Sequence, residues 1–199
     1  MFLSEPKTPE AEAFLDKELA ANGYVMNLER AWAWRPDVAE AFMALRKQLT
    51  DHSALQPREV ALLVCTTARA RGDSYCALAW GTRLAGIASD ALAAAVLRGE
   101  AHAQLTQRER ALQHWATLVV RDPNAASARD VGGLRAAGLS DREILEATVF
   151  IGLRLAFSTI NDALGAPPDA ELVAAAPQAV RQAVAYGRAP AGVSRASSS

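Results

Sequence analysis

The chain has 199 residues, of which 51% are hydrophobic and 22% charged, and its formal net charge is -1. This composition is typical of one globular domain and excludes intrinsic disorder of its main part. A nearly neutral chain lacks the basic surface that binds nucleic acids or anionic membranes, so we expect neither partner.

Cap residues and helix-breaking residues alternate along the alanine-rich sequence and predict helix throughout. Thr106–Glu109 and Ser140–Glu143 have the spacing of capping boxes. We predict an all-α bundle of about eight to ten helices and no strand. The expected helices span 9–21, 25–34, 37–50, 57–71, 74–87, 89–98, 107–121, 128–137, 141–164 and 176–186.

Residues 1–186 are expected to form a single domain, and residues 187–199, which are small and polar, a disordered tail. A five-residue pattern occurs three times, as Leu55-Gln-Pro-Arg-Glu59, Leu105-Thr-Gln-Arg-Glu109 and Leu139-Ser-Asp-Arg-Glu143. Its offsets of 50 and 34 residues do not match each other. We therefore interpret the pattern as three similar helix starts rather than as an internal repeat.

The start of the chain shows no basic segment followed by an apolar one, and no apolar stretch is long enough to span a membrane. The two cysteines are too few for a disulfide framework, and free thiols are typical of a reducing compartment. We therefore expect a cytoplasmic protein. Two cysteines and three histidines without ligand spacing also favour a protein without a metal.

The segment with the clearest chemical potential is Gly72-Asp73-Ser74-Tyr75-Cys76. Asp73 is a natural N-cap, which places Cys76 in the first helical turn, where the helix dipole favours an anion. This position predicts a lowered pKa for an accessible thiol, whereas the nearby Asp73 carboxylate would raise the pKa. A buried, inert cysteine is the alternative.

Other residues near this segment have two interpretations each. Trp80 lies four residues after Cys76 and therefore on the same helix face. It forms either the wall of a pocket above the thiol or part of the core. Cys65 is expected in the core, and a disulfide with Cys76 requires the two helices to pack closely.

Arg154 lies in the middle of a nearly all-apolar helix, so it is expected to be buried and paired. Glu59 is the partner that we expect. Such a pair is either a structural contact or a site for a carboxylate or hydroperoxide group. Polar residues at the end of the same helix either line the mouth of a pocket or only close the helix before Gly165: Ser158, Asn161 and Asp162.

Several of these segments together resemble the alkylhydroperoxidase D and carboxymuconolactone decarboxylase family. The resemblance covers about residues 20–170 and rests on Arg58-Glu59, Asp73-Ser-Tyr-Cys76-Ala-Leu-Ala-Trp80, Leu134-Arg-Ala-Ala-Gly-Leu-Ser-Asp-Arg-Glu-Ile144 and Phe157-Ser-Thr-Ile-Asn-Asp-Ala-Leu-Gly165. It implies the family's helical bundle, a small-molecule substrate and assembly into a homo-oligomer. The flat apolar runs at 91–97 and 171–176 are the helices that we expect at subunit contacts.

The sequence departs from the family pattern at two motif positions. Asp73 stands where the family has its first cysteine, and Trp80 stands where it has histidine. Because only one cysteine remains, a disulfide within the motif is impossible. Glu59 also lies farther upstream of Cys76 than in the family pattern.

The resemblance leaves three functions open. The first is a peroxidase-like, antioxidant oxidoreductase that uses the single Cys76 thiolate with an external thiol reductant and no cofactor. The second is a cofactor-free decarboxylase or isomerase acting on a small organic acid or lactone through Arg154 and Glu59. The third is a non-catalytic oligomeric binding protein. For the first, the expected catalytic residues are Cys76, Glu59 and Asp73, and the expected pocket residues are Trp80, Tyr75, Arg154, Ser158 and Asn161.

Overall fold

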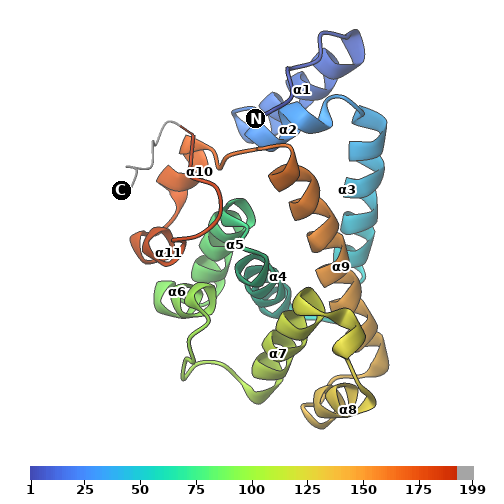
Figure 1. The fold of residues 1–199 in the computed structure, drawn as a ribbon, viewed down its shortest axis with the longest axis vertical. Helices are drawn as coiled ribbons and strands as arrows, with labels where there is room; N and C mark the ends of the chain where they lie inside the picture. Colours follow the sequence, from blue (N-terminus) through green and yellow to red (C-terminus); the bar gives the residue numbers. More distant parts are fainter. Residues whose placement is uncertain (192–199) are drawn as a thin grey trace.

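A computed structural model describes residues 1–191, which form eleven α-helices and a short 3-10 helix at Pro123–Ala125, with no strand among them (Figure 1). This confirms the predicted all-α fold. The α-helices are α1 (Pro9–Asn22), α2 (Asn27–Trp32), α3 (Pro36–Asp51), α4 (Pro57–Arg71), α5 (Ser74–Ile87), α6 (Asp90–Arg98), α7 (Gln107–Arg121), α8 (Ala128–Ala136), α9 (Asp141–Ala163), α10 (Ala170–Ala175) and α11 (Gln178–Ala183). Helix α10 falls outside the ten ranges expected from sequence, although its residues belong to the apolar run 171–176 that we expected at a subunit contact.

Helix α4 is the centre of the molecule. It packs against α5, α6, α7 and α9, and Figure 1 shows it nearly end-on among them. Every residue from Glu59 to Ala68 is buried, as expected of a helix that is surrounded on all sides. Gly72 ends α4 in the left-handed conformation, with a φ of 78°, and Asp73 starts α5 directly afterwards. The two helices therefore form a tight hairpin.

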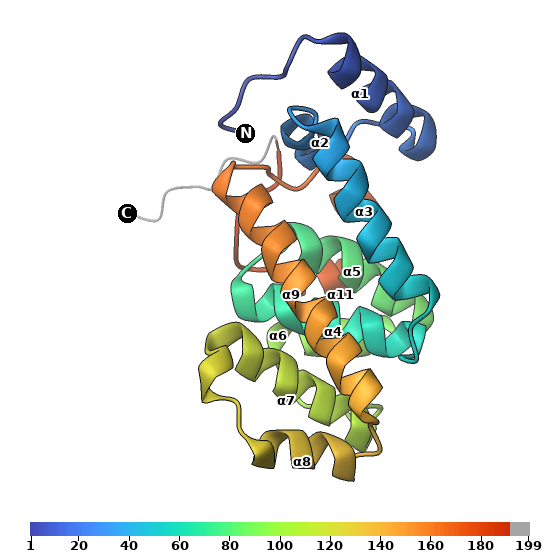
Figure 2. The ribbon, with the colours of Figure 1, turned by 90° about the vertical axis from the view of Figure 1, so that its right-hand side faces the viewer.

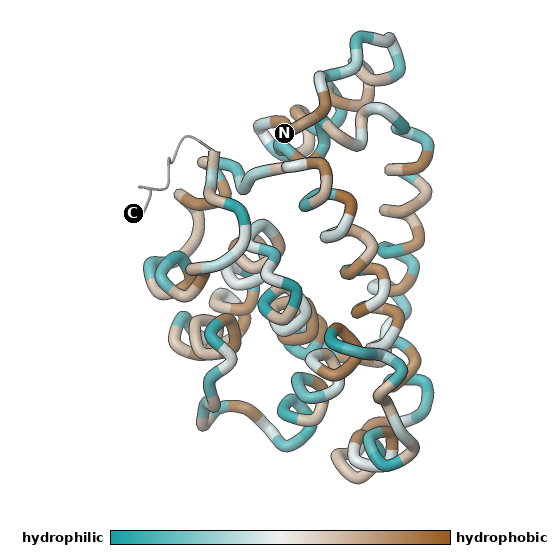
Figure 3. Tube along the Cα trace, in the orientation of Figure 1, coloured by the Kyte–Doolittle hydropathy of each residue, from teal (hydrophilic) through white to brown (hydrophobic). Residues whose placement is uncertain are grey.

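Helix α9 is the longest helix among residues 1–191, and it crosses the face of the α4–α5 hairpin. In Figure 2 it runs obliquely across the molecule, with α1 and α2 beyond one end and α8 at the other. Figure 3 shows apolar residues recurring along its length. Helix α3 packs on the side of α9. This arrangement brings the second half of α9 to the start of α5.

The three copies of the five-residue pattern meet at one place. Each glutamate closes a capping box at the start of its own helix, in α4, α7 and α9, which confirms that the patterns are helix starts. The arginines then join different copies, because Arg58 pairs with Glu109 at 2.6 Å and Arg108 pairs with both Glu59 and Glu143 at 2.5 Å. We call these ion pairs the Arg–Glu clasp.

Two segments differ from their expected roles, because both pack against the rest of this chain. Residues Leu92 to Leu97 are buried within α6, which packs against α5 and α11, so this run belongs to the chain's own core. Residues 187–191 lie in the expected disordered tail, yet the carbonyl of Arg188 accepts a hydrogen bond from Ser74 and the N–H of Ala191 donates to Pro168. The rest of that tail lies outside the described residues. Among the described residues, no helix is long and apolar enough to cross a membrane.

The clasp predicts a large effect of Arg108 on stability. Arg108→Ala leaves the buried Glu59 and the neighbouring Glu143 without their cation, so we expect the free energy of unfolding to fall by about 2–3 kcal/mol. Urea unfolding measures this change. Arg135 and Asp141 form an exposed pair, and Arg135→Ala is the control that should keep the wild-type midpoint. Equal losses in the two variants would contradict a special role of the clasp.

Candidate functional site

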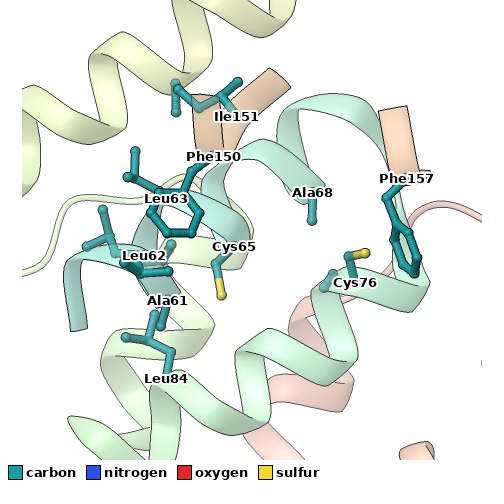
Figure 4. Close-up of a cluster of buried hydrophobic side chains, with 14 of the residues drawn as sticks. Ala61, Leu62, Leu63, Cys65, Ala68, Cys76, Leu84, Phe150, Ile151 and Phe157 are labelled. Carbon is teal, nitrogen blue, oxygen red and sulfur yellow. The ribbon is translucent and has the colours of Figure 1, made fainter. Parts of the chain in front are cut away.

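The start of α5 presents Cys76 from a capped first turn. Oδ1 of Asp73 accepts a hydrogen bond of 2.9 Å from the backbone N–H of Cys76. Asp73 and Cys76 are both almost fully buried, with 1% and 3% of their surfaces exposed. Figure 4 shows the sulfur of Cys76 directed toward the ring of Phe157 on α9.

Helix α9 supplies the groups opposite Cys76. Arg154 and Ser158 are four residues apart and therefore lie on one face of the helix. Nη1 of Arg154 lies 3.6 Å from the Cys76 sulfur, and the Ser158 hydroxyl oxygen lies 3.8 Å from it. The Ser158 hydroxyl donates a hydrogen bond to Oδ2 of Asp73. Cys76, Asp73, Ser158 and Arg154 thus form one buried polar cluster, which we call the Cys76 cluster.

Arg154 is a buried cation without a carboxylate partner. Among residues 1–191, no acidic group lies within ion-pair distance of it. Its guanidinium lies over the rings of Trp80 and Phe157, at 5.2 and 5.5 Å from their centroids. Two aromatic faces and a sulfur atom therefore take the place of an acid.

The expected pairing of Arg154 with Glu59 is wrong. Glu59 pairs with Arg108 in the clasp and also accepts a hydrogen bond from the N–H of Gln56. It lies nine residues before Ala68, the α4 residue beside Cys76 in Figure 4, which corresponds to about 13 Å along the helix. Glu59 thus holds the start of α4 and is not part of the Cys76 cluster.

The electrostatics of the cluster keep the resting thiol protonated. Burial and the negative charge of Asp73 raise the pKa of Cys76, Arg154 acts in the opposite direction, and the net result is a pKa of about 12. The pKa of this thiol is thus raised, as the sequence argument from the Asp73 carboxylate predicts, and not lowered. Burial also raises the pKa of Cys65, and both cysteines are free.

The other expected pocket residues lie around the cluster in different roles. Trp80 is half-buried and lies between buried Arg154 and exposed Arg83, whose guanidinium is 4.9 Å from the ring centroid. Tyr75 donates a hydrogen bond to Asp169, and Oδ1 of Asn161 accepts one of 2.9 Å from the indole of Trp32. Tyr75 and Asn161 therefore support the surrounding helices and do not touch the thiol.

The pKa of Asp162, at the end of α9, is also affected by the cluster. Burial raises its pKa to about 6, and the charge of Asp73 contributes to the rise. No group of three or more metal-binding side chains occurs among the described residues.

Arg46, which was not predicted from the sequence, also lies beside the cluster. Its guanidinium lies 5.3 Å from the centroid of the Phe157 ring, the ring that Arg154 also contacts. Burial lowers the pKa of Arg46 to about 10, and the charge of Arg154 contributes to this change. The sequence does contain a pattern that could have indicated Arg46, because this residue interrupts an apolar stripe of Ala39, Phe42 and Met43 at helical spacing.

Comparison with solved structures gives the class of the fold. The chain is similar to an alkylhydroperoxidase AhpD core, an uncharacterized peroxidase-related protein from Ralstonia eutropha JMP134, with a TM-score of 0.75 and 21% identity over 86% of this chain and 93% of the other. It is equally similar to an uncharacterized peroxidase-related protein from Silicibacter sp. TM1040, with a TM-score of 0.75 and 22% identity over 86% and 93% of the two chains. The chain therefore has the alkylhydroperoxidase D-like fold, as the resemblance in sequence predicted.

A third solved structure has the same fold and another activity. It is a cysteine-to-alanine variant of the debrominase Bmp8 in complex with 2,3,4-tribromopyrrole, with a TM-score of 0.69 and 17% identity over 87% of this chain and 92% of the other. No family model and no curated protein matches the sequence.

The raised pKa of Cys76 predicts how its alkylation depends on pH. In a Cys65→Ala background, the rate with iodoacetamide should still be rising well above the reference pKa of about 8.5, because the rate follows the thiolate fraction. Asp73→Asn keeps a side-chain oxygen for the cap and removes the charge, so it should move the profile to lower pH. Asp37→Asn, on the exposed surface, is the control. A plateau below about pH 8.5 in the Cys65→Ala protein would contradict a raised pKa of Cys76.

Proposed function

We propose that the protein is a one-cysteine thiol peroxidase, in which Cys76 reduces a hydroperoxide and an external thiol restores the cysteine. The observation that supports this most strongly is the contact between the Cys76 sulfur and the buried, unpaired guanidinium of Arg154. Burying a cation without an acid is costly, the aromatic and sulfur contacts of Arg154 offset that cost only in part, and an anion formed beside it would offset more. Both the thiolate and the alkoxide that leaves a peroxide are such anions.

The first step is an attack of sulfur on the terminal oxygen of the peroxide. The S–O bond forms as the O–O bond breaks, so the sulfur becomes a sulfenic acid and the peroxide becomes an alcohol. Because the resting thiol is protonated, its proton must leave during the attack. Ser158 donates to Asp73 and its hydroxyl oxygen lies 3.8 Å from the sulfur, so it can accept the thiol proton as it passes its own to Asp73, from which a proton reaches the leaving oxygen.

The second half of the reaction uses the external thiol. Its sulfur attacks the sulfenic acid, water leaves, and a mixed disulfide forms at Cys76. A second thiol molecule attacks this disulfide, which releases the oxidised reductant and regenerates the Cys76 thiol. A second protein cysteine is not needed.

The alternatives from sequence have less support. The decarboxylase or isomerase required Glu59 beside Arg154, and Glu59 belongs to the clasp. The non-catalytic protein required a core filled by Trp80, whereas Trp80 is half-buried and leaves a charged cluster beneath it. Neither alternative explains why an arginine faces a thiol in the interior.

The peroxidase proposal predicts a trapped intermediate and a specific effect of Arg154. With a hydroperoxide and dimedone, the Cys65→Ala protein should gain one dimedone adduct at Cys76 by mass spectrometry, and Cys76→Ser should gain none. Arg154→Gln should slow sulfenic acid formation about a hundredfold, because a preorganised cation at the developing charge is lost. Arg83→Gln is the matched control, since Arg83 contacts the same Trp80 ring from the exposed side.

Two results would reject this proposal. One is peroxide consumption at the wild-type rate by Cys76→Ser. The other is an Arg154→Gln protein that folds and forms the sulfenic acid as fast as the Arg83→Gln control.

Asp73 should show opposite effects in two reactions of the same thiol. Asp73→Asn should accelerate alkylation at neutral pH, because the pKa of Cys76 falls. It should slow peroxide reduction, because the proton acceptor beside Ser158 is lost. Parallel acceleration of both reactions, measured by stopped-flow kinetics, would show that Asp73 only perturbs the pKa.

A further inference from the structure

A second cavity lies between α1, α2 and α3, outside the Cys76 cluster. Its volume is about 550 Å³, a size that suits a small organic molecule. Its apolar lining includes Phe14 from α1, Met26 at the residue before α2, and Ala39 and Met43 from α3. Thioether and aromatic side chains provide a wall for an aliphatic ligand.

Glu29 is the polar group that this cavity leaves without a partner. Only 4% of its surface is exposed, and among the described residues its carboxyl group forms no ion pair and no side-chain hydrogen bond. Burial raises the pKa of Glu29 to about 7, as do the charges of Glu18 and Asp169, and Arg46 acts in the opposite direction. The Glu29 carboxyl oxygens are not among the fully enclosed unpaired atoms of the described residues, so this side chain, which lines the cavity, can still be reached there by a ligand.

The other charged groups that line the cavity already have contacts. Lys17 pairs with Glu40 at 2.7 Å. Glu18 accepts a hydrogen bond of 3.1 Å from Asn22. Arg46 lies on the Phe157 ring and contacts the Met43 sulfur at 3.0 Å. Three acids thus face two cations in this lining, and the acid without a partner is the buried one.

We propose that this cavity binds an organic ammonium ion with an apolar body, whose ammonium group pairs with Glu29. The aliphatic part of the ligand lies against the methionine and phenylalanine side chains. The site is separate from the thiol and does not depend on the proposed peroxidase activity. An organic anion would instead be drawn to Arg46 and repelled by the three acids.

The charge of the ligand determines how binding depends on pH. An alkylammonium ion stays charged throughout the neutral range, as a lysine side chain does. It binds the ionised form of Glu29, so binding lowers the pKa of Glu29 and releases a proton. Affinity should therefore rise about tenfold between about pH 6 and about pH 8, across the pKa near 7. An anion would show proton uptake and the opposite dependence.

Calorimetry with n-hexylammonium on the full chain tests the proposal. We expect saturable binding, proton release measured from buffers of different ionisation heat, and much weaker binding of hexanoate. Glu29→Gln keeps the shape of the side chain and should abolish both binding and the pH dependence. Glu12→Gln, on the exposed face of α1, is the matched control and should bind as the wild type does.

Each contrary result rejects the proposal. Tighter binding of hexanoate with proton uptake would assign the cavity to anions at Arg46. Absence of hexylammonium binding, or equal binding by Glu29→Gln and the wild type, would exclude Glu29 as the anchor. If Glu29→Gln fails to fold, the comparison of the two ligands and their pH dependence in the unmodified chain still decides the question.

Discussion

The Arg–Glu clasp is the constraint on which the arrangement of the central helices depends. Arg58 and Arg108 each reach a glutamate that caps another helix, so the starts of α4, α7 and α9 are fixed at one point. With their starts held together, the direction of each helix determines what meets farther along. The end of α4 turns through Gly72 into Asp73, and α9 passes that turn with Arg154 and Ser158. The clasp therefore positions the thiol cluster from a distance.

Asp73 combines a structural and a chemical role that oppose each other. One carboxylate oxygen of Asp73 caps α5, and the other accepts a hydrogen bond from the Ser158 hydroxyl, so both oxygens have a donor. The same charge, together with burial, keeps Cys76 protonated. Arg154 compensates only in part, since Asp73 and Arg154 do not form an ion pair. The cluster thus holds a thiol whose reactivity depends on moving a proton, in contrast to a thiolate that is ionised at rest.

Local chemistry made most of the fold predictable from sequence. Capping boxes such as Thr106–Glu109 and the glycine at position 72 mark helix ends through interactions between near neighbours. The site depends on contacts between distant residues, which a single sequence does not specify. Cys76 and Arg154 are 78 residues apart, and they meet because α9 packs against α4, whose end turns directly into α5. Glu59 was misassigned because a buried glutamate near a motif has the same local pattern whether it caps a helix or serves catalysis.

The two buried sites share an electrostatic connection through Phe157. Arg46 lies on this ring from the side of the α1–α3 cavity, and Arg154, which contacts Cys76, lies on it as well. The charges of Cys76 and Glu29 both act on Arg46, so the two acids share one cation. A change in the charge of Glu29 therefore alters the electrostatic field at Arg46, which lies on the same ring as Arg154.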